Sequence, residues 1–219
     1  MNATKKFLVL LFITIWLAFN STVPAYAGDI GIMSTSIPRG QYLTGDFTQV
    51  RMVPGRNFKL RTSGTFLVWP DHGLVWHVSE PFLSTIVITE NTAVQAGADQ
   101  NFSPIAGMSD HSGTMLEVLN LILAGNLQAL KSASYFDPLE TTEMPDGRVV
   151  VRVSLLDNQS EQTYFEVTIS PTVGGHVSEA KIFQGAGSPE PVQATKFSNH
   201  NTRPLPVPAQ WQRVFESSL

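Results

Sequence analysis

The stretch Thr44–Thr89 constrains the fold more than any other part of this 219-residue chain. Its aliphatic, β-branched and aromatic runs are separated by Gly and Pro, a pattern typical of consecutive short strands. In the second run, Phe66 and Val68 share one face of the predicted strand. Leu67 and Trp69 share the opposite face, which is equally apolar. A strand that is apolar on both faces needs cover on both sides, from protein or from an apolar ligand.

Along the sequence, strands are predicted both before and after one long helix. The turn signals between them are short, and Asp146-Gly147 is a typical hairpin turn. Residues Asn199–Pro208 are expected to be extended, and Trp211–Phe215 to form a terminal turn. The predicted strands are Phe47–Met52, Gly64–Trp69, Leu74–Val78, Ser84–Thr89, Thr92–Gln95, Arg148–Leu156, Thr163–Ser170, His176–Phe183 and Pro191–Phe197.

The helix is predicted over Met115–Leu130, with Ser112 as its N-cap. Its apolar residues recur at helical spacing, and Glu117 is the only charge in its first three turns. A helix this apolar must be buried over most of its circumference. Strands, one apolar helix and further strands together predict a mainly β, α+β fold, in which a large antiparallel sheet curls around the helix.

The first 27 residues have the features of a secretory signal peptide. Lys5 and Lys6 supply the positive charge, Phe7–Phe19 is almost uninterruptedly apolar, and Ala25-Tyr26-Ala27 is a cleavage motif. The apolar run is shorter than the ~20 residues that a membrane-spanning helix needs. We therefore expect cleavage before Gly28 and export to the periplasm.

Residues 28–219 are expected to form a single domain. Without Lys5 and Lys6, 12 basic residues face 18 acidic ones, which gives a net charge of −6. This balance argues against nucleic acid and against an anionic membrane surface as partners. The chain has no Cys, which excludes disulfides, thiol catalysis and lipid attachment to a cysteine.

Patterns of catalytic residues are lacking. The five His residues do not have the spacing of a metal site, and no G-x-S-x-G motif is present. Asp110, His111 and Ser112 are adjacent in sequence, but a catalytic triad is defined by its geometry. We therefore expect a non-enzymatic protein without metal or cofactor.

Three short motifs, in order, resemble the outer-membrane lipoprotein carrier (LolA-like) family. The family's F-x-Q motif is matched by Phe47-Thr48-Gln49. A glycine followed by alternating apolar residues is matched by Gly64–Val68. The family's W-x-x-x-x-P motif is matched by Trp76–Pro81, followed at Ser84–Ile88 by the strand that the family has next. The predicted helix matches the family's central helix.

This resemblance implies an incomplete antiparallel β-barrel wrapped around a helical lid, with a concave apolar face that holds acyl chains. It implies a carrier for lipid or lipidated cargo that is expected to be a monomer. This carrier takes its load from an inner-membrane exporter and delivers it to an outer-membrane acceptor. Trp69 is expected to contact the lid. The expected lipid-binding residues are Phe47, Phe66, Val68, Leu74, Trp76, Val78, Ile86, Ile88, Leu116, Leu119 and Leu123.

One departure from the family concerns the residues before Pro70. Lipoprotein carriers have an Arg beside a Pro there, which ties the lid to the sheet, whereas this chain has Trp69-Pro70. The departure favours a divergent branch of the family and leaves the cargo open between a lipoprotein, a glycolipid and another envelope lipid. Two alternatives also stay open: a sensor or binding module with the same fold, and a structural envelope protein whose barrel is filled by its own side chains.

Overall fold

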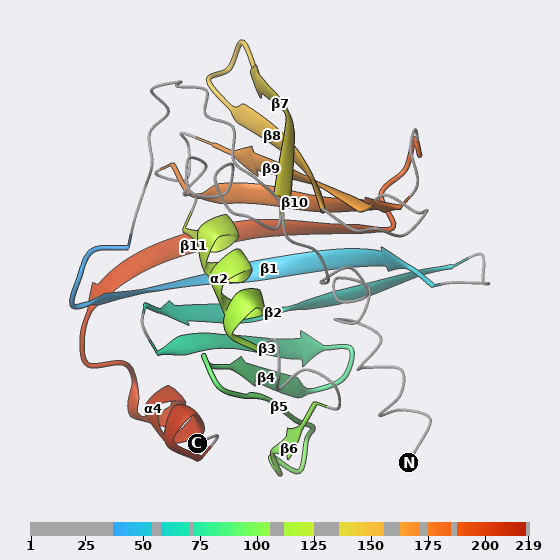
Figure 1. The fold of residues 1–219 in the computed structure, drawn as a ribbon. Coiled ribbons are helices and arrows are strands. Elements are labelled where there is room, and N and C mark those ends of the chain that lie inside the picture. The colour runs from blue at the N-terminus through green and yellow to red at the C-terminus, as the bar shows by residue number, and fades with distance from the viewer. Residues whose placement is uncertain are drawn as a thin grey trace.

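In the computed structural model of the chain, an antiparallel sheet curves around one helix (Figure 1). The predicted signal peptide, residues 1–27, and its cleavage motif lie outside the part of the chain that the structure describes. The described residues are 37–53, 58–70, 72–105, 112–124, 136–155, 163–170, 175–184 and 188–217.

Within these ranges the chain forms eleven strands and two helices. The strands are β1 (Gln41–Met52), β2 (Lys59–Trp69), β3 (Gly73–Glu80), β4 (Ser84–Ile88), β5 (Ala93–Ala96), β6 (Ser103–Pro104), β7 (Phe136–Glu143), β8 (Val149–Leu155), β9 (Thr163–Ile169), β10 (Val177–Gln184) and β11 (Gln193–Pro204). The helices are α2 (Ser112–Leu123) and α4 (Ala209–Ser217).

Strands β1 and β11 join the two halves of the sheet. The order is β6-β5-β4-β3-β2-β1-β11-β10-β9-β8-β7, so the first and last of the described strands lie side by side at the centre of the sheet. The described edge strands, β6 and β7, do not pair with each other, and the barrel is therefore incomplete. Figure 1 shows α2 crossing in front of the central strands. The predicted fold class, a mainly β, incomplete antiparallel barrel with a helix, is confirmed.

The face of the sheet beneath α2, called the inner face below, carries one continuous apolar cluster. It unites both halves of the sheet, because Phe66 and Trp76 come from the first half and Phe165 from the second. Among the α2 side chains that the structure describes, Leu116, Ile122 and Leu123 are buried in this cluster.

The outer face of the first half is covered by α4. Leu67, Val75 and Val87 alternate along their strands with the inner-face residues, and they pack with Phe215 of α4. The two apolar faces of β2 therefore both meet protein. Helix α2 lies over one face and α4 over the other.

The outer face of the second half carries a group of charged side chains. Glu166 on β9 accepts hydrogen bonds from Arg152 on β8, at 3.0 Å, and from Lys181 on β10, at 2.9 Å. Partial burial raises the pKa of the Glu166 carboxyl, but these hydrogen bonds and charges outweigh it and hold the pKa below its usual value. The same face also carries an aromatic pair, in which the rings of Tyr164 on β9 and Phe183 on β10 lie 5.9 Å apart.

The central strand pair is longer than predicted. Strand β1 begins at Gln41 rather than Phe47, and β11 continues to Pro204 through a segment predicted to be only extended. A register shift between Thr44 and Asp46 allows this pairing, with Asn199 in a left-handed conformation (φ 53°) on the opposite strand. Local sequence gave little sign of the extension, because polar residues dominate both added segments.

Two further elements differ from the prediction. Strand β7, which was not predicted, has the polar sequence FDPLETTE, and its Pro138 is tolerated because β7 is an edge strand. The predicted terminal turn is the nine-residue helix α4. The predicted central helix is confirmed over Ser112–Leu123, whereas its expected continuation to Leu130 lies outside the described residues.

Candidate functional site beneath helix α2

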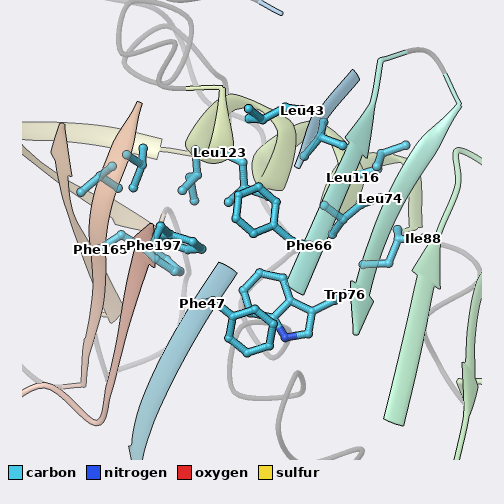
Figure 2. Close-up of a cluster of buried hydrophobic side chains, with 14 of the residues drawn as sticks. Leu43, Phe47, Phe66, Leu74, Trp76, Ile88, Leu116, Leu123, Phe165 and Phe197 are labelled. Atoms are coloured by element: carbon cyan, nitrogen blue, oxygen red, sulfur yellow. The ribbon is translucent and has the colours of Figure 1, made fainter. Parts of the chain in front are cut away.

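Aromatic rings occupy the middle of the inner face. The rings of Phe47 on β1 and Trp76 on β3 stack, with centroids 3.9 Å apart and an interplanar angle of 27°. Phe66 lies 6.3 Å from Trp76, and Phe197 meets Phe66 edge to face at 5.7 Å. Figure 2 shows these side chains converging from strands of both halves of the sheet.

Gly64 explains how Phe47 and Trp76 reach each other across β2. Gly64 is the register partner of Phe47 and lies on the same face. Because it has no side chain, nothing on β2 keeps the two rings apart. Strand β3 approaches closely here, so that a Cβ added at Gly64 would collide with the backbone oxygen of His77. The three sequence motifs therefore meet at one place in the fold.

A cavity of about 60 Å³ lies between α2 and the inner face. Ligand pockets usually enclose ~300–1,000 Å³, so an acyl chain fits only if α2 moves. The lining residues are Gln49, Trp76, Leu119, Ile122, Leu123, Phe165, Ala180, Ile182, Gln193, Thr195 and Phe197.

One end of the cavity is polar. Gln49 Nε2 donates to Thr195 Oγ1 at 3.1 Å, and Thr62 Oγ1 donates to Gln49 Oε1 at 3.5 Å. Gln193 lies next along β11 on the same face and is 7% exposed. Its Oε1 is buried and has no hydrogen-bond partner. An apolar cavity that ends in hydrogen-bonding groups suits a ligand with a polar end and an apolar tail.

A pair of histidines lies elsewhere against the aromatic cluster. The rings of His176 and His200 stack with centroids 5.0 Å apart, and His200 lies 5.8 Å from the ring of Phe66. Both nitrogens of His200 and Nδ1 of His176 are buried without a hydrogen-bond partner. Burial, followed by the charge of His176, lowers the pKa of His200 to about 4, and burial also lowers the pKa of His176.

Helix α2 covers the inner face through apolar side chains. Leu116 and Leu123 are buried, and Leu119 is half-buried over the cavity. The helix also carries Asn120, whose Oδ1 is buried without a partner. A buried acceptor of this kind costs about 1–3 kcal/mol, so the closed position of α2 is less stable than a fully satisfied one.

All eleven residues predicted to bind lipid belong to the inner-face cluster or pack against it. Only Trp76, Leu119 and Leu123 of this set line the cavity. The other eight fill the core around it: Phe47, Phe66, Val68, Leu74, Val78, Ile86, Ile88 and Leu116. Lipid binding by any of them stays a prediction.

Trp69 was predicted to contact the helical lid, and this contact stays a prediction because residues 125–130 of the predicted lid lie outside the described residues. Trp69 stacks on His72 at 3.7 Å and meets Phe215 of α4 edge to face at 5.5 Å. It therefore lies on the outer face, whereas the described part of α2 covers the inner one. Because side chains alternate along β2, Trp69 cannot share the face of Phe66 and Val68.

The second half of the sheet supplies cavity residues that the sequence prediction did not include. Phe165, Gln193 and Phe197 all line the cavity. The period-2 alternation of β11 would have placed Gln193, Thr195 and Phe197 on one face. The missing information was that this face meets that of β1. Only the long-range pairing of the two strands brings the two halves together.

The described ranges contain no group of three or more His, Asp or Glu side chains placed to hold a metal ion. Among the described helices, none is long and apolar enough to span a membrane.

Comparison with known proteins gives only distant likenesses. No protein-family model and no curated protein matches the chain. A LolA superfamily protein from Nitrosomonas europaea is similar in structure, with 9% identity, 83% of this chain and 92% of that chain covered, and a TM-score of 0.39. A putative outer membrane lipoprotein-sorting protein domain from Vibrio parahaemolyticus has 6% identity, coverages of 83% and 94%, and a TM-score of 0.37. The function is therefore argued from the geometry of this chain.

Proposed function

We propose that this protein is a non-enzymatic periplasmic carrier that binds the acyl chains of a lipid or of a lipidated cargo between α2 and the inner face, and moves them between membranes. One observation carries the proposal: an apolar helix covers an apolar concave face and leaves a cavity with a polar end beneath it. A donor in the inner membrane and an acceptor in the outer membrane belong to the proposal.

Loading requires an exchange of apolar surfaces. In the closed state, Leu119, Ile122 and Leu123 of α2 shield the inner face from water. An acyl chain offers the same kind of surface, and the hydrophobic effect depends on the area buried rather than on direction. A chain that takes the place of α2 therefore keeps the inner face dry. The first methylene groups of the acyl chain can enter the small cavity.

Two features lower the cost of moving α2. The cavity beneath the helix leaves part of its inner surface without packing partners, and close packing is what normally stabilises a buried helix. Asn120 Oδ1 gains access to water or to a ligand group when the helix lifts. The apolar side of α2 must therefore be kept from water, but its packing against the inner face is incomplete. A lid that a ligand can displace needs both properties.

The test is a charge placed on the underside of the lid. Leu119→Asp puts a carboxylate into the cavity at a half-buried position, where it can reach water when the lid lifts. We expect affinity for a fluorescent fatty-acid probe to fall by about tenfold or more, with a native circular dichroism spectrum.

Val214→Asp is the matched control, because it places the same charge beneath α4 on the outer face. This control is expected to leave probe affinity unchanged. Equal loss of affinity in both variants, or unchanged binding in folded Leu119→Asp, would contradict the proposed site. Native mass spectrometry of protein purified from the envelope should, in addition, detect a co-purifying acyl lipid.

A further inference from the structure

Gln193 is a buried polar side chain whose carbonyl oxygen lacks a hydrogen-bond donor. It belongs to β11, lines the cavity beneath α2 and is only 7% exposed. None of the residues that the structure describes donates a hydrogen bond to its buried Oε1. Because a buried acceptor without a donor destabilises a protein, the donor is expected to come from a ligand in the cavity.

The other amide and hydroxyl side chains of the cavity wall are already engaged with their neighbours. Gln49 Nε2 donates to Thr195 Oγ1 at 3.1 Å, and Gln49 Oε1 accepts from Thr62 Oγ1 at 3.5 Å. On the other side of β11, the register partner of Gln193 is Ile182 of β10, whose apolar side chain also lines the cavity. The oxygen of Gln193 is therefore the acceptor that a ligand can use.

The cavity wall is uncharged. None of the described residues that line it is Asp, Glu, Lys, Arg or His. A carboxylate, a phosphate or an ammonium group inside the cavity would lose its water without gaining an ion-pair partner, which is strongly unfavourable. The donor that meets Gln193 is therefore expected to be an uncharged N–H or O–H group.

The direction of the ligand follows from the row of side chains on β11. Gln193, Thr195 and Phe197 all line the cavity, and alternation along the strand places them on one face. The row from Gln193 to Phe197 spans roughly 13 Å, at about 3.3 Å for each residue. It ends where the ring of Phe197 meets that of Trp76 edge to face, with centroids 6.2 Å apart. A ligand whose donor meets Gln193 thus directs its tail toward these rings.

We propose, on the basis of the carrier function above, that the cavity selects acyl chains joined through a secondary amide, and that Gln193 Oε1 accepts a hydrogen bond from the amide N–H. Such an amide is uncharged, and its N–H follows directly on the carbonyl group of the acyl chain. An ester-linked chain, or a fatty acid with an ionised carboxyl, offers only acceptors at this point and leaves Gln193 without a partner.

Four ligands with the same palmitoyl chain isolate the donor. N-methylpalmitamide has the N–H, and methyl palmitate has an oxygen in its place at nearly the same size. N,N-dimethylpalmitamide has a methyl group in place of the hydrogen, and palmitate ends in a carboxylate. Each is measured by displacement of a fluorescent acyl probe, below its aggregation limit. We expect N-methylpalmitamide to bind about tenfold more tightly than each of the other three.

The substitution Gln193→Met assigns the preference to this residue, because methionine has a similar length and no carbonyl oxygen. The tenfold difference between N-methylpalmitamide and methyl palmitate should shrink to less than about twofold in this variant. Gln212→Met is the matched control, since Gln212 is exposed on α4, which covers the opposite face of the sheet. This control is expected to keep the preference of the parent protein. A thermal melt of each variant checks that it is folded.

The outcomes separate this inference from the carrier function. Equal affinities of the four ligands for the parent protein would overturn the amide preference and leave the acyl site standing, with water as the donor to Gln193. A preference that persists unchanged in Gln193→Met would overturn the role of Gln193. If none of the four ligands binds to the parent protein, the carrier function itself is wrong. The comparison in the parent protein needs no variant, so it decides the amide preference even if Gln193→Met does not fold.

Discussion

Gly64 illustrates how one residue determines the centre of the inner face. The backbone of β3 leaves no space for a Cβ there, and the aromatic pair above it depends on the missing side chain. Gly64→Ala is expected to lower the free energy of unfolding by about 2 kcal/mol or more, as overpacking does. Urea unfolding measures this change. Gly97→Ala is the control, since a Cβ there meets only the Asp99 carboxylate at 3.7 Å. Equal stability of the two variants would contradict the close approach.

The histidine pair predicts a pH dependence of stability. In the folded state His200 has a pKa of about 4, whereas an unfolded histidine takes up its proton near pH 6.5. Below pH 6.5 the unfolded state therefore binds more protons, and stability falls as the pH drops toward 4 and levels off below it. His176, whose pKa is also lowered, acts in the same direction.

The variant His200→Gln isolates this contribution. The difference in unfolding free energy between pH 7 and pH 4 is expected to be smaller than in the parent by about 1–2 kcal/mol, after allowance for partial solvent exposure. Carboxylates titrate in the same range, but they contribute equally to both proteins. Parallel stability profiles for parent and variant would show that His200 is not held neutral by the fold.

Among the elements, α4 covers the outer face of the first half of the sheet, and the sequence prediction did not include this helix. Trp69→Ala is expected to destabilise the protein by about 3 kcal/mol, because a large ring is lost between β2 and Phe215. The affinity for acyl probes should stay unchanged, since Trp69 lies on the face opposite the cavity. Thermal denaturation and probe titration on the same sample check both parts. A stable variant with weakened acyl binding would place Trp69 in the lid after all.

The apolar contacts of helix α2 lead to a prediction about the salt dependence of lipid transfer. Its described buried side chains are apolar, so lifting the helix exposes hydrocarbon rather than breaking ion pairs. The rate of lipid transfer to acceptor vesicles is therefore expected to change less than about twofold between 50 mM and 500 mM salt. Neutral vesicles keep the salt effect on the membrane small. A steep salt dependence would show that a charged contact holds the lid.

Some elements could be predicted from sequence because one physical rule was enough. Period-2 alternation assigned Leu74, Trp76 and Val78 to one face of β3, and helical spacing identified α2. Strand β7 could not be found this way, because a polar edge strand has no alternating pattern. The position of Trp69 required knowledge of which element covers each face, and the sequence was apolar on both. Gln193 became a site candidate only through the pairing of β1 with β11.

For the molecule as a whole, we expect an acyl chain to enter the half-barrel and to reach its aromatic centre. Trp76 is the natural fluorescent reporter of this site, because it lines the cavity. Trp69 and Trp211, of which the second belongs to α4, pack on the outer face. The fourth tryptophan, Trp16, lies in the predicted signal peptide. Replacing Trp69 and Trp211 by Phe in the protein without residues 1–27 leaves Trp76 as the only tryptophan.

The most direct measurement is the quenching of Trp76 fluorescence by palmitate brominated along its chain. We predict saturable quenching with the affinity found by probe displacement, and none with unbrominated palmitate, because a bromine atom quenches only at contact. A protein that binds brominated palmitate while Trp76 keeps its full emission would contradict the account, since the acyl chain would then lie outside the half-barrel.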